Sequence, residues 1–284
     1  MLDAICTFDP EHPKTYSIFE FKVLPESEID KLRYSLLCPA CQQQAYFRRA
    51  SIDGRQACFG SRYHKPNCVE FNPSKRKAEE DKQIAEVDKI VLSEDSLIID
   101  FSKTPAVEKV SKPALKAEDT ASSKINAKKT TEKETQPVKD KIKVSKQGLA
   151  TLLTSLLRGS SLASSDLWIY TSDKHKWRAK NLFVNIADAE PTENGAPRMY
   201  WGTISHADKT LNWLNPAENR SVGLPIEKFR GEFLDRFSIK ESADVEGAGF
   251  IIFGKCFLSK DKKRKYIQLW GEDLQYFYLS KSEL

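Results

Sequence analysis

The sequence predicts an α+β chain, mostly β, in which two folded domains are joined by a disordered charged linker. Three observations predict this organisation. Paired Cys and His residues are concentrated before residue 69, the middle of the chain is charged and nearly free of aromatic residues, and all five Trp lie after residue 167. The expected segments are a small N-terminal domain over 1–72, a linker over 104–146 and a β-rich domain over 147–284.

The composition excludes several classes of protein. Lys and Arg number 45 against 40 Asp and Glu, so the net charge is only +5 over 284 residues. A histone-like polycation is excluded, and any basic surface must be local. The longest apolar stretches, 148–157 and 249–254, fall short of the ~18 residues that span a bilayer. The first residues have no secretory signal pattern. We expect no membrane association and a cytoplasmic location, or the nucleus if the source is eukaryotic.

The strongest motif is Cys38-Pro39-Ala40-Cys41 followed by His64-Lys65-Pro66-Asn67-Cys68, which is C-x2-C, a 22-residue gap and H-x3-C. An unsecreted chain of this length is expected to be reduced, so metal binding is favoured over disulfides, and unrelated buried thiols are the alternative. The spacing predicts a structural Zn²⁺ ion on Cys38, Cys41, His64 and Cys68, with Cys58 as the alternative to His64. Four protein ligands leave no open position for water, which argues against zinc catalysis.

The residues between the two pairs predict a hairpin. Gln44–Arg49 and Gln56–Gly60 are expected as strands, and Ser51–Arg55 contains the Asp-Gly turn. Together they predict a small zinc ribbon with both ligand pairs at one end. The order of features resembles the zinc-binding N-terminal region of the competence CoiA-like proteins over about 35 residues. The nuclease-like segment of that family is absent here, so the resemblance implies zinc and not nuclease activity.

Basic and aromatic residues alternate around the predicted ribbon. Arg48, Arg49 and Arg55 lie close in sequence to Tyr46, Phe47 and Phe59. Cations beside stackable rings suit nucleic acid, through phosphate contacts and base stacking. The alternative is that the rings fill a small core and the arginines form a solvated rim. A protein-docking role for the ribbon is also open.

Residues 73–146 hold 17 basic and 14 acidic residues and a single aromatic, Phe101. Such a segment cannot bury enough apolar surface to offset chain entropy, so most of it is predicted to be a disordered tether. Ser74–Ile90 could form a charged helix. Lys89–Leu92 and Ser96–Phe101 are predicted as two strands of a hairpin that either extends the first domain to residue 101 or remains a docking motif.

The last segment begins with a helix over Lys146–Arg158, because five leucines recur on one face. A second helix is expected over Pro225–Phe237. Strands are expected at Asp166–Thr171, Lys176–Asp188, Arg198–Ile204, Thr210–Leu214, Gly249–Leu258, Lys265–Trp270 and Tyr276–Leu279. This order resembles the OB fold, a five-stranded Greek-key barrel, and an unrelated α+β sandwich is the alternative.

In an OB-like barrel, the loop between the last two strands helps to bind nucleic acid. Here that loop carries Lys262, Lys263, Arg264 and Lys265, four consecutive cations suited to phosphates. Trp201 and Trp213 are candidate stacking faces. The alternatives are that the Trp residues are core and that the lysines keep an edge hairpin soluble. A nuclear import signal is a third interpretation of the basic run.

The sequence contains none of the common catalytic motifs, so we expect no enzymatic activity. The leading hypothesis is a zinc-containing protein that binds single-stranded DNA or RNA through both domains. Flexible linkage would then raise its affinity through effective concentration. The alternative is a protein-interaction adaptor or a scaffold subunit of a larger complex. A degenerate nuclease is the third possibility, but it would need a carboxylate cluster that the sequence does not display.

Overall fold

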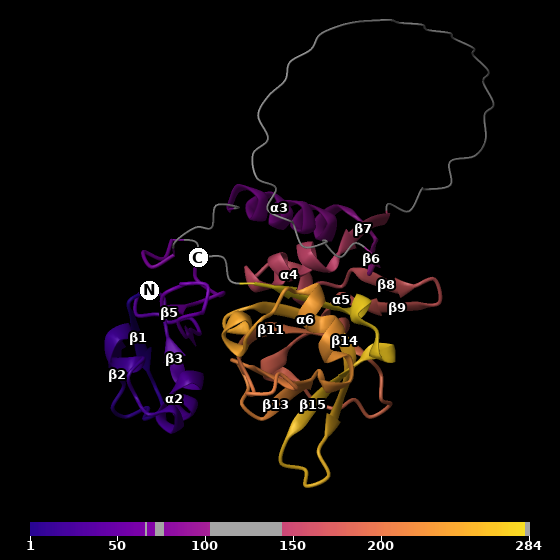
Figure 1. Ribbon diagram of the computed structural model, residues 1–284. Coiled ribbons are helices and arrows are strands. Elements are labelled where there is room, and N and C mark those ends of the chain that lie inside the picture. The colour runs from indigo at the N-terminus through magenta and orange to yellow at the C-terminus, as the bar shows by residue number, and fades with distance from the viewer. Residues whose placement is uncertain (66, 72–76, 103–143, 282–284) are drawn as a thin grey trace, which may run out of the picture.

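The computed structural model describes residues 1–65, 67–71, 77–102 and 144–281, and its fold is mixed α and β with strands predominating (Figure 1). An N-terminal module that ends at residue 71 lies beside a barrel, and a four-stranded sheet with two longer helices lies above the barrel. Residues 104–143 of the predicted linker lie outside the described residues. Within the described ranges, no helix is long and apolar enough to cross a membrane.

Five strands close into a barrel that is consistent with an OB-like fold. They are β11 (Arg198–Ala207), β12 (Trp213–Pro216), β13 (Val222–Pro225), β14 (Gly249–Leu258) and β15 (Lys265–Leu269). Neighbours follow the order β11-β12-β13-β15-β14, and β14 pairs with β11 to close the barrel. β13 and β15 run parallel, while the other neighbours are antiparallel. Helix α6 (Arg230–Arg236) lies between β13 and β14 along the chain.

Apolar side chains fill the barrel interior. Tyr200 of β11 and Phe250 of β14 are completely buried, and Phe233 of α6 belongs to the same cluster. Gly254 allows a close strand contact, because a Cβ there would lie 2.3 Å from the carbonyl oxygen of Gln268 on β15. Two further strands extend the barrel sheet: β10 (Phe183–Asn185), parallel to β11, and β16 (Phe277–Ser280), antiparallel to β14.

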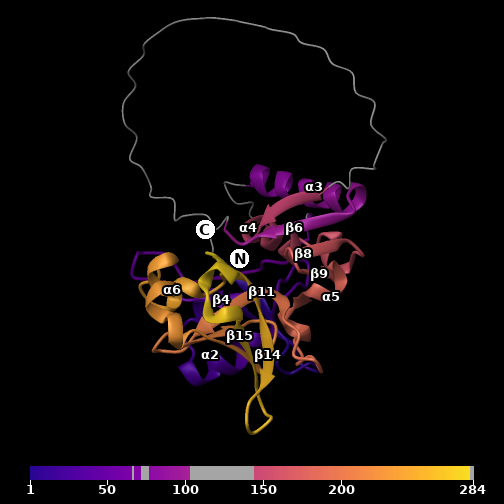
Figure 2. The ribbon, with the colours of Figure 1, turned by 90° about the vertical axis from the view of Figure 1, so that its right-hand side faces the viewer.

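The four-stranded sheet has the order β7-β6-β8-β9. Its strands are β6 (Ser96–Asp100), β7 (Val144–Gly148), β8 (Trp168–Ser172) and β9 (His175–Arg178). Helices α3 (Lys77–Ser93) and α4 (Leu149–Leu157) pack beside it, and the short α5 (Ala179–Leu182) follows β9 (Figure 2). The leucine face of α4 packs in one core with Leu97 of β6 and with Met199, Ile251 and Phe253 of the barrel strands. The sheet, its helices and the barrel therefore share a continuous hydrophobic core.

The N-terminal module contains two small sheets. β1 (Asp3–Cys6), β2 (Lys14–Ser17) and β3 (Leu36–Leu37) form one in the order β2-β1-β3, and β4 (Tyr46–Arg48) pairs with β5 (Cys58–Gly60) in the other. The helices are α1 (Ile18–Phe21) and α2 (Glu26–Leu32). The buried rings of Phe21, Phe47 and Phe59 lie 5.0–6.0 Å apart and form the centre of this module.

Seven short 3₁₀ helices complete the described chain: η1 (Arg33–Ser35), η2 (Ser161–Ser164), η3 (Ile186–Asp188), η4 (Glu227–Phe229), η5 (Ser242–Val245), η6 (Trp270–Glu272) and η7 (Leu274–Tyr276).

The sequence predictions for the middle of the chain need two corrections. Lys89–Leu92 is the end of α3 and not a strand, because Val87 and Ile90 are buried at helical spacing in the core that contains α4. The strand at Ser96–Phe101 is confirmed as β6, but it forms no hairpin. It pairs in parallel with β7 and β8, so it joins a sheet with the C-terminal part of the chain. Residues 144–146, predicted as the end of the linker, belong to β7.

The strands that build the barrel also differ from the prediction. Asp166–Thr171 corresponds to β8, which lies in the four-stranded sheet. The expected strand over Lys176–Asp188 is divided into β9, α5, β10 and η3. The barrel strand β13 was not predicted, because Val222-Gly223-Leu224-Pro225 is short and contains Gly and Pro, which are depleted in strands.

Candidate functional site

Four potential metal ligands from two loops lie together in the N-terminal module. The Sγ atoms of Cys38, Cys41 and Cys68 and a ring nitrogen of His64 are all within 4.8 Å of one another. The first pair follows β3 in a tight turn, in which the Gln42 N–H donates to the Cys38 carbonyl oxygen at 2.9 Å. The second pair follows β5. The fold therefore brings together the two motifs that the sequence analysis paired.

Two distances in this cluster match those between the ligands of a tetrahedral ion. Ligand bonds of about 2.3 Å to sulfur and about 2.0–2.1 Å to nitrogen place two sulfurs about 3.8 Å apart, and a sulfur and a nitrogen about 3.5 Å apart. The structure has 3.7 Å between the Sγ atoms of Cys38 and Cys68, and 3.4 Å between Cys41 Sγ and His64 Nδ1. Burial lowers the pKa of His64, which favours the neutral imidazole that coordinates a metal. These residues could therefore hold a metal ion.

Cys58, the alternative ligand, lies elsewhere. It sits on β5 opposite Arg48 and is half-buried. The structure therefore groups His64, and not Cys58, with the other three cysteines.

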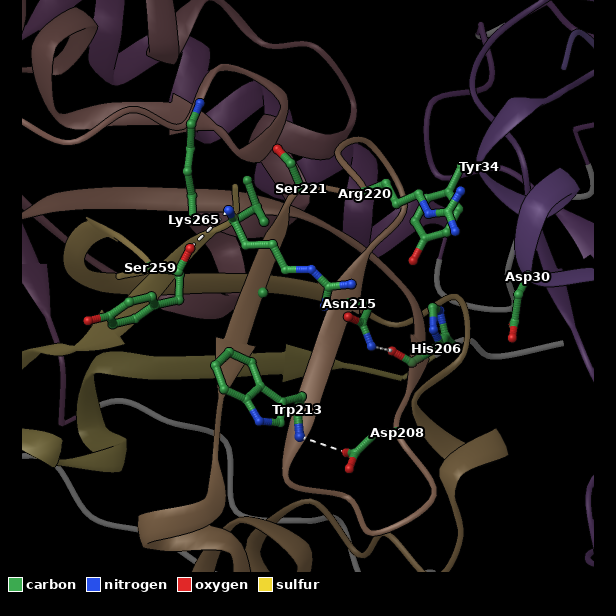
Figure 3. Close-up of a pocket in the computed structure, with 14 residues that line it drawn as sticks. Asp30, Tyr34, His206, Asp208, Trp213, Asn215, Arg220, Ser221, Ser259 and Lys265 are labelled. Atoms are coloured by element: carbon green, nitrogen blue, oxygen red, sulfur yellow. Dashed lines mark hydrogen bonds between the residues drawn. The ribbon is translucent and has the colours of Figure 1, made fainter. Parts of the chain in front are cut away.

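A groove of about 470 Å³ opens on the barrel next to the N-terminal module (Figure 3). It is lined by residues of β12, β13 and β15, by Asp208 of the loop between β11 and β12, and by the hairpin that joins β14 to β15. His206 of β11, Arg220 and Ser221 just before β13, and Asp30 and Tyr34 of the N-terminal module complete the lining. The central strands and these two loops form the face with which OB folds bind oligonucleotides and oligosaccharides.

Aromatic rings line this groove from three segments. Trp213 of β12 is 41% exposed, and its indole lies against Gly223 of β13, where a Cβ would come within 3.0 Å of the ring. Tyr266 of β15 stacks on Phe257 with ring centroids 5.5 Å apart. Tyr34 enters from the N-terminal module. The groove thus has accessible apolar ring surface of the kind on which a planar base can stack.

The cations of the groove are Arg220, Arg264 and Lys265. Arg264 is exposed, at the base of the hairpin, and the Arg220 guanidinium lies 5.7 Å from the centre of the Tyr34 ring. Lys265 is less available, because its ammonium group donates to the Ala189 carbonyl at 3.1 Å and pairs with Glu190. Arg220 and Arg264 are therefore the strongest candidates for contact with an anion.

The two carboxylates of the lining already have partners. Asp208 accepts the N–H groups of Asn212 and Trp213 at 2.7 and 2.8 Å, which fixes the loop before β12. Asp30 lies 3.8 Å from a guanidinium nitrogen of Arg33. The positive charge of the arginines is consequently only partly offset within the groove.

His206 contributes a neutral side chain to the groove. Burial, with the nearby Arg33, Arg49 and Arg220 guanidinium groups, lowers the pKa of His206 to about 3. Its ring lies edge-on to Tyr34, with centroids 5.9 Å apart. An uncharged imidazole at neutral pH can accept or donate a hydrogen bond but adds no electrostatic attraction.

The basic hairpin is only partly in the groove. Arg264 and Lys265 line it, whereas Lys262 and Lys263 are exposed at the hairpin tip outside the lining. Asp261 organises this turn by accepting the Lys263 N–H at 3.1 Å. The tip lysines could therefore reach only a ligand that extends beyond the groove.

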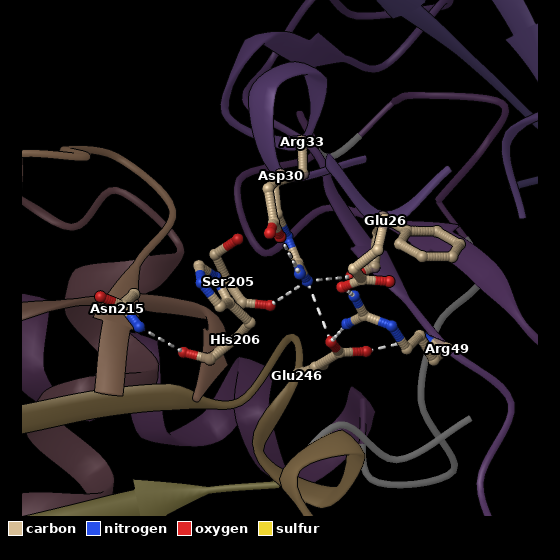
Figure 4. Close-up of polar contacts among 9 residues, drawn as sticks. Glu26, Asp30, Arg33, Arg49, Ser205, His206, Asn215 and Glu246 are labelled. Carbon is tan, nitrogen blue, oxygen red and sulfur yellow. Dashed lines mark hydrogen bonds and ion pairs between the residues drawn. The ribbon is translucent and has the colours of Figure 1, made fainter. Parts of the chain in front are cut away.

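Two arginines predicted as nucleic-acid contacts have structural roles instead. Arg48, the last residue of β4, is buried, and its guanidinium donates to the Gln56 carbonyl oxygen at 3.5 Å. Arg49 pairs with Glu246 and Glu26, where the N-terminal module meets the barrel (Figure 4). The Arg48 guanidinium is enclosed and the Arg49 guanidinium is held in ion pairs, so the prediction for these two residues is corrected. Arg55 is exposed on the turn at 51–55 and does not line the groove.

Trp201, the other predicted stacking residue, also lies outside the groove. It is half-buried against the core that contains α4, with its ring centroid 6.4 Å from that of Tyr63. Residue 201 of β11 faces the other side of the strand from the barrel interior, where Tyr200 lies. Its position therefore favours a packing role.

Sequence reasoning missed Arg220, Tyr34 and Tyr266. Arg220 precedes β13, a strand that was not predicted, and Tyr34 comes from a module that is distant in sequence. Of these three residues, only Tyr266 could have been found from the sequence. It directly follows the basic run 262–265 and alternates with the buried Ile267 on β15.

Comparisons with protein families, curated proteins and solved structures find no match for this chain. The resemblance to the CoiA-like proteins therefore stays a prediction.

Proposed function

We propose that this protein binds single-stranded DNA or RNA in the groove between the barrel and the N-terminal module, without catalysing a reaction. The observation that carries the proposal is the convergence of exposed Trp213 with Arg220 and Arg264 on the oligonucleotide-binding face of an OB-like barrel. The same groove combines two kinds of contact that single strands need: a ring for bases and guanidinium groups for phosphates.

A single strand fits this surface better than a duplex. Stacking on Trp213 requires an accessible base face, and paired bases in a duplex hide their faces against their neighbours. No contact in the groove requires a particular base, so we expect weak sequence preference. The 2′-hydroxyl of RNA could be accommodated by His206 or Asn215, which both line the groove.

We further propose that the Cys38, Cys41, His64 and Cys68 cluster holds a structural Zn²⁺ ion in a ribbon-like module. Three thiolates and one imidazole in a tetrahedral arrangement are a typical structural zinc set, and they leave no position for a substrate. When bound, the ion would hold together the loops after β3 and β5. Its contribution to the groove would be indirect, because the module also presents Tyr34 there.

The experiment is fluorescence anisotropy with the full-length protein and labelled (dT)₁₅, an oligouridine of equal length and a DNA duplex. We expect both single strands to bind more tightly than the duplex. Trp213→Ala should weaken single-strand binding by about 5- to 100-fold, because stacking contributes about 1–3 kcal/mol per base. Trp270→Ala is the matched control: Trp270 is 38% exposed and lies outside the groove lining.

The cation contribution is separated by salt dependence. Arg220→Gln with Arg264→Gln should lower the slope of log Kd against log salt concentration by about 1.4, roughly 0.7 for each lost phosphate contact. Arg55→Gln removes an exposed charge outside the groove and should leave the slope unchanged. If none of the three nucleic acids binds at low salt, the proposal fails, and an adaptor role becomes the leading hypothesis.

A further inference from the structure

Among the residues that the structure describes, helices cover the four-stranded sheet on one face only. Leu97, Ile99 and Ile169 point into the core with α3 and α4. The three strands β7, β6 and β8 run parallel, and parallel sheets are normally buried on both faces. The opposite face is partly open: Ile98 and Val144 are exposed on it, whereas Ser96 and Asp100 on the same face are buried.

The strand register shows which side chains share the open face. One row across the sheet is Val144, Ser96, Trp168 and Arg178, and the next is Lys146, Ile98, Tyr170 and Lys176. Each row therefore contains an apolar residue on β7 or β6, an aromatic ring on β8 and a cation on β9. The second row has a further cation at the β7 edge. Figure 2 shows β6, β8 and β9 side by side.

The cations are held against the rings. The Arg178 guanidinium lies 3.9 Å from the centre of the Trp168 ring system, and the Lys176 ammonium lies 4.6 Å from it. Neither Trp168 nor Tyr170 packs in the three hydrophobic cores of the described chain. Ile98, on the central strand β6, is 36% exposed and Val144 is 46% exposed. This face thus presents rings, aliphatic groups and positive charge together.

The charge indicates what covers the face. Residues 103–143, which connect β6 to β7 along the chain, have a net positive charge, with eleven Lys against six acidic residues. A basic segment is a poor partner for a face that carries Lys146, Lys176 and Arg178. A polyanion with planar groups matches both the cations and the rings.

We propose that this open sheet face is a second contact surface for single-stranded nucleic acid, separate from the barrel groove. The inference rests on the proposed function for its class of ligand. Tyr170 and the Arg178 guanidinium, backed by Trp168, supply planar surfaces for bases. Lys176 and Lys146 supply positive charge for phosphates, and the Lys146 ammonium group also forms an ion pair with the Asp100 carboxylate at 3.1 Å. A strand long enough to reach both surfaces gains affinity by effective concentration.

The test compares (dT)₁₀ and (dT)₄₀ binding to the full-length wild type and to a Tyr170→Ala/Lys176→Gln variant. We expect the variant to lose about fivefold or more of its affinity for (dT)₄₀, and less for (dT)₁₀. Longer strands also offer more binding registers, so the comparison between proteins, and not between lengths, decides the outcome. Lys14→Gln/Tyr16→Ala is the matched control, because Lys14 also lies over a half-buried tyrosine, at 4.2 Å, on a strand of the N-terminal module.

Ultraviolet crosslinking of wild-type protein to (dT)₄₀ gives a readout that does not depend on the variants folding. We expect crosslinked peptides from residues 168–178 in addition to peptides around Trp213. Wild-type affinity of the variant for (dT)₄₀, with crosslinks confined to the groove, would overturn this inference and leave the proposed function intact. Absence of binding by the wild type would instead refute the proposed function.

Discussion

Arg33 joins the N-terminal module to the barrel through a completely buried guanidinium group (Figure 4). It donates to the Ser205 carbonyl oxygen at 2.7 Å and to the Glu246 carboxylate at 3.0 Å. Glu246 is almost fully buried as well and also accepts the Arg49 N–H at 2.7 Å. A buried ion-pair network thus links the module to the barrel, and in it each charge compensates the desolvation of another.

Arg33→Ala is expected to lower the free energy of unfolding by about 3–5 kcal/mol, because it leaves Glu246 with less compensation in a buried site. Urea denaturation followed by tryptophan fluorescence measures this change. Arg55→Ala, at an exposed arginine, should change it by less than about 0.5 kcal/mol. Equal effects of the two substitutions would show that the buried network does not stabilise the fold.

Glu218 predicts a pH effect on stability. Its carboxylate is enclosed and accepts the Tyr63 hydroxyl and the Thr203 N–H, and burial raises the pKa of this group to about 7. The folded protein therefore binds a proton on the Glu218 carboxyl group more tightly than the unfolded chain does. The resulting stability is complete below about pH 4.5 and is lost as the pH rises towards 7, at about 1.4 kcal/mol per pKa unit.

Glu218→Gln removes that titration. The free energy of unfolding of the variant minus that of the wild type should increase from about pH 5 to about pH 8, because only the wild type loses stability over this range. The His206 pKa, lowered by burial, acts in the opposite direction but contributes to both proteins and cancels in the difference. Urea titrations at the two pH values measure the effect, and a difference independent of pH would contradict it.

At the scale of elements, α4 connects the four-stranded sheet to the barrel. Its leucines contact both, and a Cβ on Gly249 of β14 would lie 2.7 Å from a Leu157 methyl group. The five-leucine pattern alone predicts this helix, since a single apolar face of that width requires a partner surface. The identity of the partner is decided by the fold, because it lies about a hundred residues away along the chain.

Leu152→Ala tests this packing. Leu152 is fully buried on α4, so the substitution should cost about 2–5 kcal/mol of the free energy of unfolding through lost burial and a residual cavity. Leu92→Ala on α3 is the control, because Leu92 is exposed. Thermal and urea unfolding of both variants measure the difference, and similar stability of the two would disprove the assigned packing of α4.

Local sequence was least informative for short elements. Lys89–Leu92 is apolar enough for a strand, but three turns of preceding helix and a core contact at Val87 and Ile90 keep it helical. β13 is the opposite case: Gly223 weakens its strand propensity, yet the residue is required for contact with the Trp213 indole. In both segments, tertiary packing overrides the local preference for a particular secondary structure.

At the scale of the whole molecule, we predict that metal loss weakens both the module and the groove. Cys41→Ser should abolish the stoichiometric zinc measured by mass spectrometry of the metal content, and it should lower the melting temperature. It should also weaken (dT)₁₅ binding, because Tyr34 in the groove belongs to the module that the proposed ion would hold together.

Cys58→Ser is the matched control. Cys58 lies outside the cluster, so we expect this variant protein to retain its zinc. Loss of zinc in Cys58→Ser and retention in Cys41→Ser would reverse the ligand assignment. Zinc loss without any change in (dT)₁₅ binding would separate the metal from the groove.

The sequence by itself determined the features that depend on short spacing. The ligand pairs at 38–41 and 64–68, the leucine helix, the strand at 249–258 and the basic hairpin all follow from contacts between near neighbours or from periodicity. Chelation and amphipathic periodicity are local constraints, so they can be recognised without knowledge of the fold.

Only the tertiary structure decided which side chains meet. It placed Arg49 against Glu246, brought Tyr34 to a groove with Arg220 and Trp213, and inserted β6 between strands that follow it by more than forty residues. Such contacts depend on how strands pair and on which faces become buried. Those are cooperative properties of the whole chain, because burial of each charge or ring is favourable only once its distant partner is in position.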